Sequence, residues 1–138
     1  AHWRTLIETL ADQRFVLFCT AGDRPVAAAV ARGFPASRVA DMTGRTDLPA
    51  FADNLRTCAF LVTNDTGGMH LANAVGVPLI ALFGPTNPLR TGPVFSAPVA
   101  ILQPPGCPPT GGGALADLAP STVIDALRGF LAAPTAGV

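Results

Sequence analysis

The sequence predicts an α/β fold in which helices cover both faces of a parallel, Rossmann-like sheet. Apolar runs of four or five residues, rich in Val, Ile, Leu and Phe, are continuous rather than alternating, as in strands that are buried on both faces. Stretches with helical spacing lie between these runs, and strands that alternate with helices indicate βαβ units. The expected strands are residues 15–19, 59–63, 79–83 and 99–102, with a weaker candidate at 38–42.

The expected helices follow from the spacing of apolar residues and from residues typical of helix ends. Leu6, Ile7 and Leu10 share one face of the first helix. Gly33 is a natural stop for the second, and Pro49 lies in the first turn of the third, where a missing N–H costs nothing. The helices are expected at residues 2–13, 25–32, 47–57, 68–75 and 120–131, and loops at the Pro- and Gly-rich segments 84–98 and 103–118.

The length of 138 residues suffices for one domain and is too short for two full ones. We therefore expect residues 1–138 to form a single domain. A doubly wound domain normally begins with a central strand, whereas this chain begins with a predicted helix. The sequence thus predicts a domain that is truncated at its N-terminus.

Composition excludes several classes of function. Nine arginines balance nine acidic residues and lysine is absent, so the chain lacks the positive charge of a nucleic-acid-binding protein and the lysine of a P-loop. No apolar run approaches the roughly 18 residues of a membrane span. Three cysteines, an odd number, argue against a disulfide framework, and the cysteines and histidines show no metal-ligand spacing. We expect no metal and no cofactor.

The most informative segment follows the second apolar run, where a polar turn with two glycines leads into a helix. In open α/β sheets, ligands bind at the carboxyl ends of strands, beside helix N-termini that favour anions. Gly67 and Gly68 would let a phosphate approach the backbone, with His70 facing the same anion. Asp65 would orient the turn or accept ligand hydroxyls. The pattern alone leaves open that Asp65 and Thr66 only cap the helix and that His70 is a surface or packing residue.

Other catalytic classes fit these residues less well. Asp65-Thr66-Gly67 is also the triplet of aspartic proteases, but that fold is all-β and this chain has several predicted helices. The glycine pattern of dinucleotide-binding turns and the GxSxG motif of serine hydrolases are both absent. An aspartic protease, a dinucleotide-binding protein and a serine hydrolase are therefore disfavoured.

Several spaced motifs occur in one order along nearly the whole chain. Gly44-Arg45-Thr46-Asp47-Leu48 is followed by the segment 64–72, by Gly76-Val77-Pro78 and by Leu82-Phe83-Gly84-Pro85-Thr86 with Pro88, Arg90 and Gly92-Pro93. Cys107-Pro108 and Pro120-x-x-Val123 complete the series. Together these motifs resemble the C-terminal half of glycosyltransferase family 9, the lipopolysaccharide heptosyltransferases, and the series is far more specific than any one motif.

This resemblance implies a GT-B architecture, in which two Rossmann-like domains enclose the active site and the C-terminal one holds the sugar nucleotide. It implies an inverting transfer without a metal, from ADP-heptose or another nucleotide sugar to a lipopolysaccharide core or related glycan. The acceptor domain with its general base is absent from this sequence, so we expect no catalytic residue here and an inactive isolated chain. The expected location is the cytoplasm, peripheral to the inner membrane of a Gram-negative bacterium.

The resemblance also implies roles for single residues. Asp65, Thr66, Gly67 and Gly68 would wrap the diphosphate and sugar of the donor, with His70 beside them.

Three further positions are implied to contact the donor. Thr46 would lie near the adenine, and Asp23 stands where the family has an acidic contact to the ribose. Because the chain has no lysine, Arg90 is a candidate to stabilise the leaving diphosphate, with a solvated loop arginine as the alternative.

Two other functions stay open. A UDP-N-acetylglucosamine 2-epimerase-like enzyme shares the GT-B fold. After the turn, however, that group has a segment similar to Gln-Glu-Glu-Ala, where this chain has Met69-His70-Leu71-Ala72. A non-catalytic nucleotide-sugar-binding module would differ from an enzyme by lacking an upstream half with an acidic base.

Overall fold

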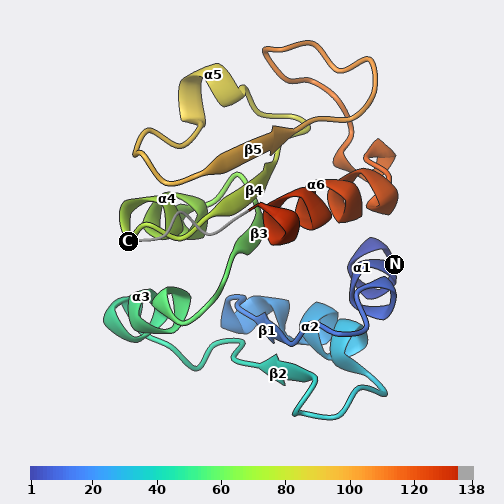
Figure 1. The fold of residues 1–138 in the computed structure, drawn as a ribbon, viewed down its shortest axis with the longest axis vertical. Coiled ribbons are helices and arrows are strands. Elements are labelled where there is room, and N and C mark those ends of the chain that lie inside the picture. The colour runs from blue at the N-terminus through green and yellow to red at the C-terminus, as the bar shows by residue number, and fades with distance from the viewer. Residues whose placement is uncertain (134–138) are drawn as a thin grey trace. The chain divides into compact units, whose positions relative to one another are not determined.

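The computed structural model describes residues 1–133, which form two compact units (Figure 1). The first unit comprises Ala1–Phe51, and the second begins at Ala52. The division falls inside helix α3 (Leu48–Arg56). Within residues 1–133, none of the helices has the length and apolar character of a membrane span.

The first unit contains a two-stranded parallel sheet in which Phe15 lies opposite Val39. Its core is formed by Ile7, Val30 and Val39, with Phe15 and Leu17 packed against them. The elements are α1 (His2–Thr9), β1 (Phe15–Leu17), the 3-10 helix η1 (Ala21–Asp23), α2 (Arg24–Ala31) and β2 (Val39–Asp41).

Two arginines close the helices of this unit. Arg4 donates to three carbonyl groups at the end of α2 at 2.7 to 3.4 Å, and its guanidinium lies 4.8 Å from the ring centroid of Phe34. Arg38 donates to two carbonyl groups at the end of α1 at 2.7 and 2.9 Å, with its guanidinium 5.4 Å from the ring centroid of Phe15. Both satisfy carbonyls that a helix end leaves without partners.

The second unit contains a three-stranded parallel sheet in the order β3-β4-β5. Leu79 of β4 pairs with Leu61 on one side and with Val99 on the other, so the carboxyl ends of the three strands share one edge. Its further elements are β3 (Leu61–Asn64), α4 (Gly67–Ala74), β4 (Leu79–Leu82), α5 (Pro88–Thr91), β5 (Val99–Leu102), the 3-10 helix η2 (Leu115–Asp117) and α6 (Pro120–Ala132).

Strand β4 is the centre of the second core. All four of its residues are buried, and since side chains alternate between the faces of a strand, both faces of β4 are covered. Helix α4 packs against β3 and β4 and buries Met69 and Ala72 completely. Helix α6 packs against β4 and buries Val123, Ile124 and Leu127.

The predicted parallel strands and flanking helices are confirmed, with two differences. The described strands form two sheets instead of one, and burial on both faces holds only for β4. Val16 is 41% exposed and Ile101 45% exposed, so one face of β1 and one face of β5 are incompletely covered. A single domain over residues 1–138 stays a prediction.

The segment 84–98, expected as a loop, contains the short helix α5. The Asn87 side chain accepts a hydrogen bond from the N–H of Leu89 at 2.9 Å, and Pro88 occupies the first helical position. Both are helix-start signals that the proline content of this segment obscured.

Asn73 is a buried polar side chain that ties α4 to the chain after α5. Its exposed fraction is 1%, its Oδ1 accepts the N–H of Phe95 at 2.6 Å, and its Nδ2 donates to the carbonyl of Phe95 at 3.3 Å. One amide thereby satisfies both backbone groups of Phe95, which fixes the β4–β5 connection against the inner face of α4.

We expect Asn73→Ala to lower the free energy of unfolding by about 2 kcal/mol, because it leaves two backbone groups without partners. Urea unfolding measures this loss. Asn64→Ala, at an exposed position, is the matched control and should change stability by less than about 0.5 kcal/mol. Equal effects of the two substitutions would contradict the clamping role of Asn73.

Candidate functional site

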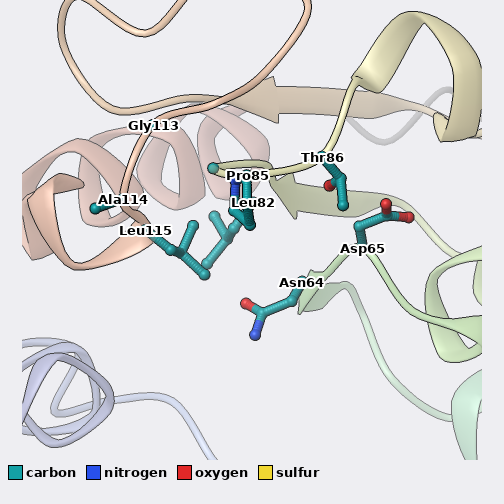
Figure 2. A pocket seen from close by; sticks show the side chains of 9 residues that line it. Asn64, Asp65, Leu82, Pro85, Thr86, Gly113, Ala114 and Leu115 are labelled. Atoms are coloured by element: carbon teal, nitrogen blue, oxygen red, sulfur yellow. The ribbon is translucent and has the colours of Figure 1, made fainter.

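A pocket of about 300 Å³ opens at the carboxyl edge of the three-stranded sheet (Figure 2). Parallel pairing brings the ends of β3 and β4 to this edge, and a third segment from the tail of the chain closes it. Its lining consists of Asn64 at the end of β3 with Asp65 directly after it, Leu82 at the end of β4 with residues 84–86 after it, and residues 113–115.

Asp65 brings a carboxylate to this pocket. Its Oδ2 accepts a hydrogen bond from the hydroxyl of Thr91 at 2.8 Å, and that hydroxyl also lies 3.1 Å from the carbonyl oxygen of Asn87. Helix α5 therefore helps to orient the acidic side chain. In Figure 2 the side chains of Asp65 and Thr86 lie on the right of the view, with the amide of Asn64 below them. These groups can accept and donate hydrogen bonds to ligand hydroxyls.

Helix α4 begins immediately after Asp65. Thr66 is its N-cap residue in an extended conformation, but the Thr66 side chain makes no capping hydrogen bond; its hydroxyl lies 3.3 Å from that of Thr63. The first N–H groups of a helix have no partners within it. The reading in which the Thr66 side chain only caps the helix is therefore wrong, and the start of α4 can receive an anion.

Gly67 stands in the first turn of α4 without a packing reason. A Cβ at this position would meet nothing within 4 Å. The local fold therefore accepts a larger residue there, and the backbone at this exposed position is open to approach from outside.

Residues 111–115, called the tail segment here, are held against the turn after β4 by contacts between glycine backbones. The carbonyl of Gly84 accepts the N–H groups of Gly112 and Gly113 at 2.9 and 3.1 Å. A Cβ on Gly84 would lie 2.9 Å from both the carbonyl oxygen of Gly113 and the backbone nitrogen of Leu115. Gly111 has φ +88°, and a Cβ there would collide with the carbonyl oxygen of Thr86. Close backbone contact at this point requires glycine.

The sequence predicts a loop over residues 103–118 and assigns none of its residues to the site, whereas residues 113–115 line the pocket. The signal that was present is the run Gly111-Gly112-Gly113, because consecutive glycines mark a close approach of backbones. Asn64 and Thr86 also line the pocket, although they were singled out only as motif residues.

Other predicted residues lie outside the pocket lining. Thr66, Gly67 and Gly68 form the start of α4, which adjoins Asp65. His70 is exposed on the same helix, and Arg90 is exposed on α5.

Asp23 and Thr46 belong to the first unit. The Oδ2 atom of Asp23 accepts hydrogen bonds from the hydroxyl and the backbone N–H of Thr20 at 2.6 and 3.2 Å, so its carboxylate organises the turn before α2. Thr46 is half-buried before α3, and the first turn of that helix is capped by Asp47, whose Oδ1 accepts the N–H of Ala50 at 2.9 Å.

Two of the three cysteines have a raised pKa, and the described residues hold no cluster of metal-binding side chains. Residues 1–133 contain no group of three or more His, Cys, Asp or Glu side chains that could hold a metal ion. Cys19, Cys58 and Cys107 are free. Partial burial and then the negative charge of Asp23 raise the pKa of the Cys19 thiol, and burial raises the pKa of Cys58. Both thiols are therefore protonated at neutral pH, and only a thiolate is a good nucleophile.

Known proteins are similar to this chain in sequence and in fold. Residues 1–111 match the sequence model described as glycosyltransferase family 9 (heptosyltransferase). Lipooligosaccharide heptosyltransferase 2 of Haemophilus influenzae is 39% identical over 98 residues, which are 67% of this chain and 28% of the relative. Lipopolysaccharide heptosyltransferase 2 of Escherichia coli K12 is 33% identical over the same shares of the two chains.

Solved structures agree. The E. coli ADP-heptose lps heptosyltransferase II has a TM-score of 0.82 and 27% identity, over 94% of this chain and 40% of that one. The E. coli heptosyltransferase WaaC with ADP has a TM-score of 0.79 and 29% identity, over 94% and 38%. The chain thus spans 28% to 40% of the length of these relatives.

The two glycines at the site predict opposite responses to an added methyl group. Gly84→Ala should lower the free energy of unfolding by about 1–3 kcal/mol, because the backbone of the tail segment has to move. Gly67→Ala should leave stability unchanged or raise it by up to about 1 kcal/mol, since alanine favours helix. Urea unfolding of both variants decides. A Gly84→Ala variant as stable as the wild type would contradict the glycine contact.

Proposed function

This chain belongs to glycosyltransferase family 9, and we propose that it is the donor-binding domain of an inverting glycosyltransferase that uses ADP-heptose or a closely related nucleotide sugar. The observation that carries the proposal is the edge of the sheet where Asp65 lines a pocket directly before α4, a helix that Thr66 does not cap with its side chain. A carboxylate that accepts sugar hydroxyls thereby adjoins a helix start that attracts phosphate.

The chemistry of glycosyl transfer explains this combination. When the bond between the sugar and the diphosphate breaks, the leaving diphosphate gains negative charge. The N–H groups at the start of α4 and the helix dipole are fixed before the reaction and stabilise this charge most strongly in the transition state. Gly67 and Gly68, the first two residues of α4, would let the phosphates approach the backbone closely. Arg90 would add positive charge there, and His70 would lie beside the phosphates.

The proposal assigns the nucleoside to residues of the first unit. Thr46 would lie near the adenine, and Asp23 would contact the ribose. The hydrogen bonds from Thr20 occupy one oxygen of the Asp23 carboxylate, so the other oxygen would take the ribose hydroxyl.

The proposal assigns no catalytic base, cofactor or metal to this chain. The base that deprotonates the acceptor would come from a second domain, equivalent to the part of the relatives that this chain does not match. The acceptor would be a lipopolysaccharide core or a related glycan. The enzyme would then work in the cytoplasm at the inner membrane of a Gram-negative bacterium.

The competing functions have less support. The relatives found are heptosyltransferases, which does not favour the epimerase-like alternative. A non-catalytic binding module would have the same donor site, and it would bind the donor without transferring its sugar.

Calorimetric titration with ADP, UDP and ADP-heptose tests the proposal. We expect the chain to prefer the ADP compounds, and Asp65→Ala and His70→Ala each to weaken ADP-heptose binding at least about tenfold, the effect of losing a hydrogen bond to a charged group. The matched controls are Asp125→Ala and His2→Ala, at exposed positions that are not part of the pocket lining, and they should bind like the wild type.

Three results would count against the proposal. A preference for UDP would favour the epimerase-like alternative. Equal losses in the site variants and in their controls would remove Asp65 and His70 from the site. Absence of binding to all three nucleotides would contradict the donor-binding function of this chain.

A further inference from the structure

The pocket has two unlike walls. Asn64, Asp65 and Thr86 form a polar wall with an amide, a carboxylate and a hydroxyl. Leu82 and Leu115 form an apolar one, and Figure 2 shows their side chains next to each other, away from the carboxylate of Asp65. A ligand in this pocket therefore meets hydrogen-bonding groups on one side and hydrocarbon on the other. A pocket that combines a polar wall with an apolar one can bind a common chemical group and still distinguish its variants.

The position of Leu115 is fixed by the backbone. Its nitrogen and Cα lie so close to Gly84 that a Cβ on that glycine would be 2.9 and 3.1 Å from them. The carbonyl of Gly84 holds the preceding residues through the N–H groups of Gly112 and Gly113. Leu118, three positions further on, is 4% exposed and anchors the segment in the core. Leu115 is therefore presented to the pocket at a defined place.

We propose that Leu115 is a specificity-determining residue that selects the sugar of the nucleotide-sugar donor, an inference that rests on the proposed donor-binding function. A sugar ring has hydroxyl groups at its edges and C–H groups on its faces. The hydroxyls bind the polar wall, and a C–H face packs on Leu82 and Leu115. A sugar that turns a hydroxyl toward Leu115 is rejected, because that hydroxyl loses its water and finds no partner.

The proposed role of Leu115 affects the affinity for the sugar and the affinity for the nucleotide differently. Leu115 contributes to the affinity for the sugar and not to the affinity for ADP, which binds at the start of α4. Removing most of the Leu115 side chain weakens an apolar contact, an effect of about tenfold in a binding pocket. Only donors that carry a sugar on the diphosphate lose this contact.

Titrations followed by NMR test this difference with ADP, ADP-heptose and ADP-mannose, a donor whose sugar is one carbon shorter. In Leu115→Ala we expect ADP affinity within twofold of the wild type, about tenfold weaker binding of ADP-heptose, and a changed ratio between the affinities for ADP-heptose and ADP-mannose. Leu131→Ala, a leucine outside the pocket lining that is 43% exposed on α6, is the matched control and should bind all three like the wild type.

A readout in the wild type needs no substitution. The methyl signals of Leu115 should shift on addition of ADP-heptose and stay in place on addition of ADP. This measurement decides even where Leu115→Ala fails to fold, and Leu115→Val provides a milder variant.

The outcomes distinguish the inference from the function on which it rests. If the wild type binds neither ADP nor ADP-heptose, the proposed function fails and the role of Leu115 fails with it. If it binds ADP-heptose while the Leu115 methyl signals stay in place, or if Leu115→Ala weakens ADP and ADP-heptose equally, the donor function stands and the specificity role is overturned.

Discussion

The contact between the Gly84 carbonyl and the N–H groups of Gly112 and Gly113 is the constraint on which the pocket depends. Strand β4 ends two residues before Gly84, and the polypeptide returns to this point only after β5 and a Pro-rich turn. Because the two backbones touch without side chains between them, the tail segment becomes a wall of the pocket. Two hydrogen bonds to one carbonyl thus join chain segments that are nearly thirty residues apart.

Helix α4 packs into the core on one face, and its first turn is open. Its inner face carries Met69 and Ala72 into the core, and Asn73 on it holds both backbone groups of Phe95. Its first turn carries Gly67, which has open space above it, and follows a threonine whose side chain leaves the turn uncapped. The packed face fixes the helix, and under the proposed function its N-terminal end would meet the donor without reorganisation, which is the condition for strong electrostatic stabilisation.

Local pattern was sufficient to predict much of this chain and insufficient for one wall of the site. The bounds of β4 and β5 follow from apolar runs, and the position of Asp65 follows from the rule that ligands bind at the carboxyl ends of parallel strands. Leu115 was not predicted, because its place depends on a backbone contact with Gly84 that leaves no periodic signal in the sequence. The exposure of Val16 was not predicted either, since an apolar run does not reveal whether both faces of its strand are covered.

The central claim is that the start of α4 receives the diphosphate of the donor, and the backbone amide signals of Gly67 and Gly68 report on it directly. Addition of ADP to the ¹⁵N-labelled chain should shift these two signals more than those of Gly129 on α6, and adenosine, which lacks the phosphates, should leave them in place. Binding of ADP that leaves the Gly67 and Gly68 signals unchanged, or that adenosine reproduces, would contradict the claim.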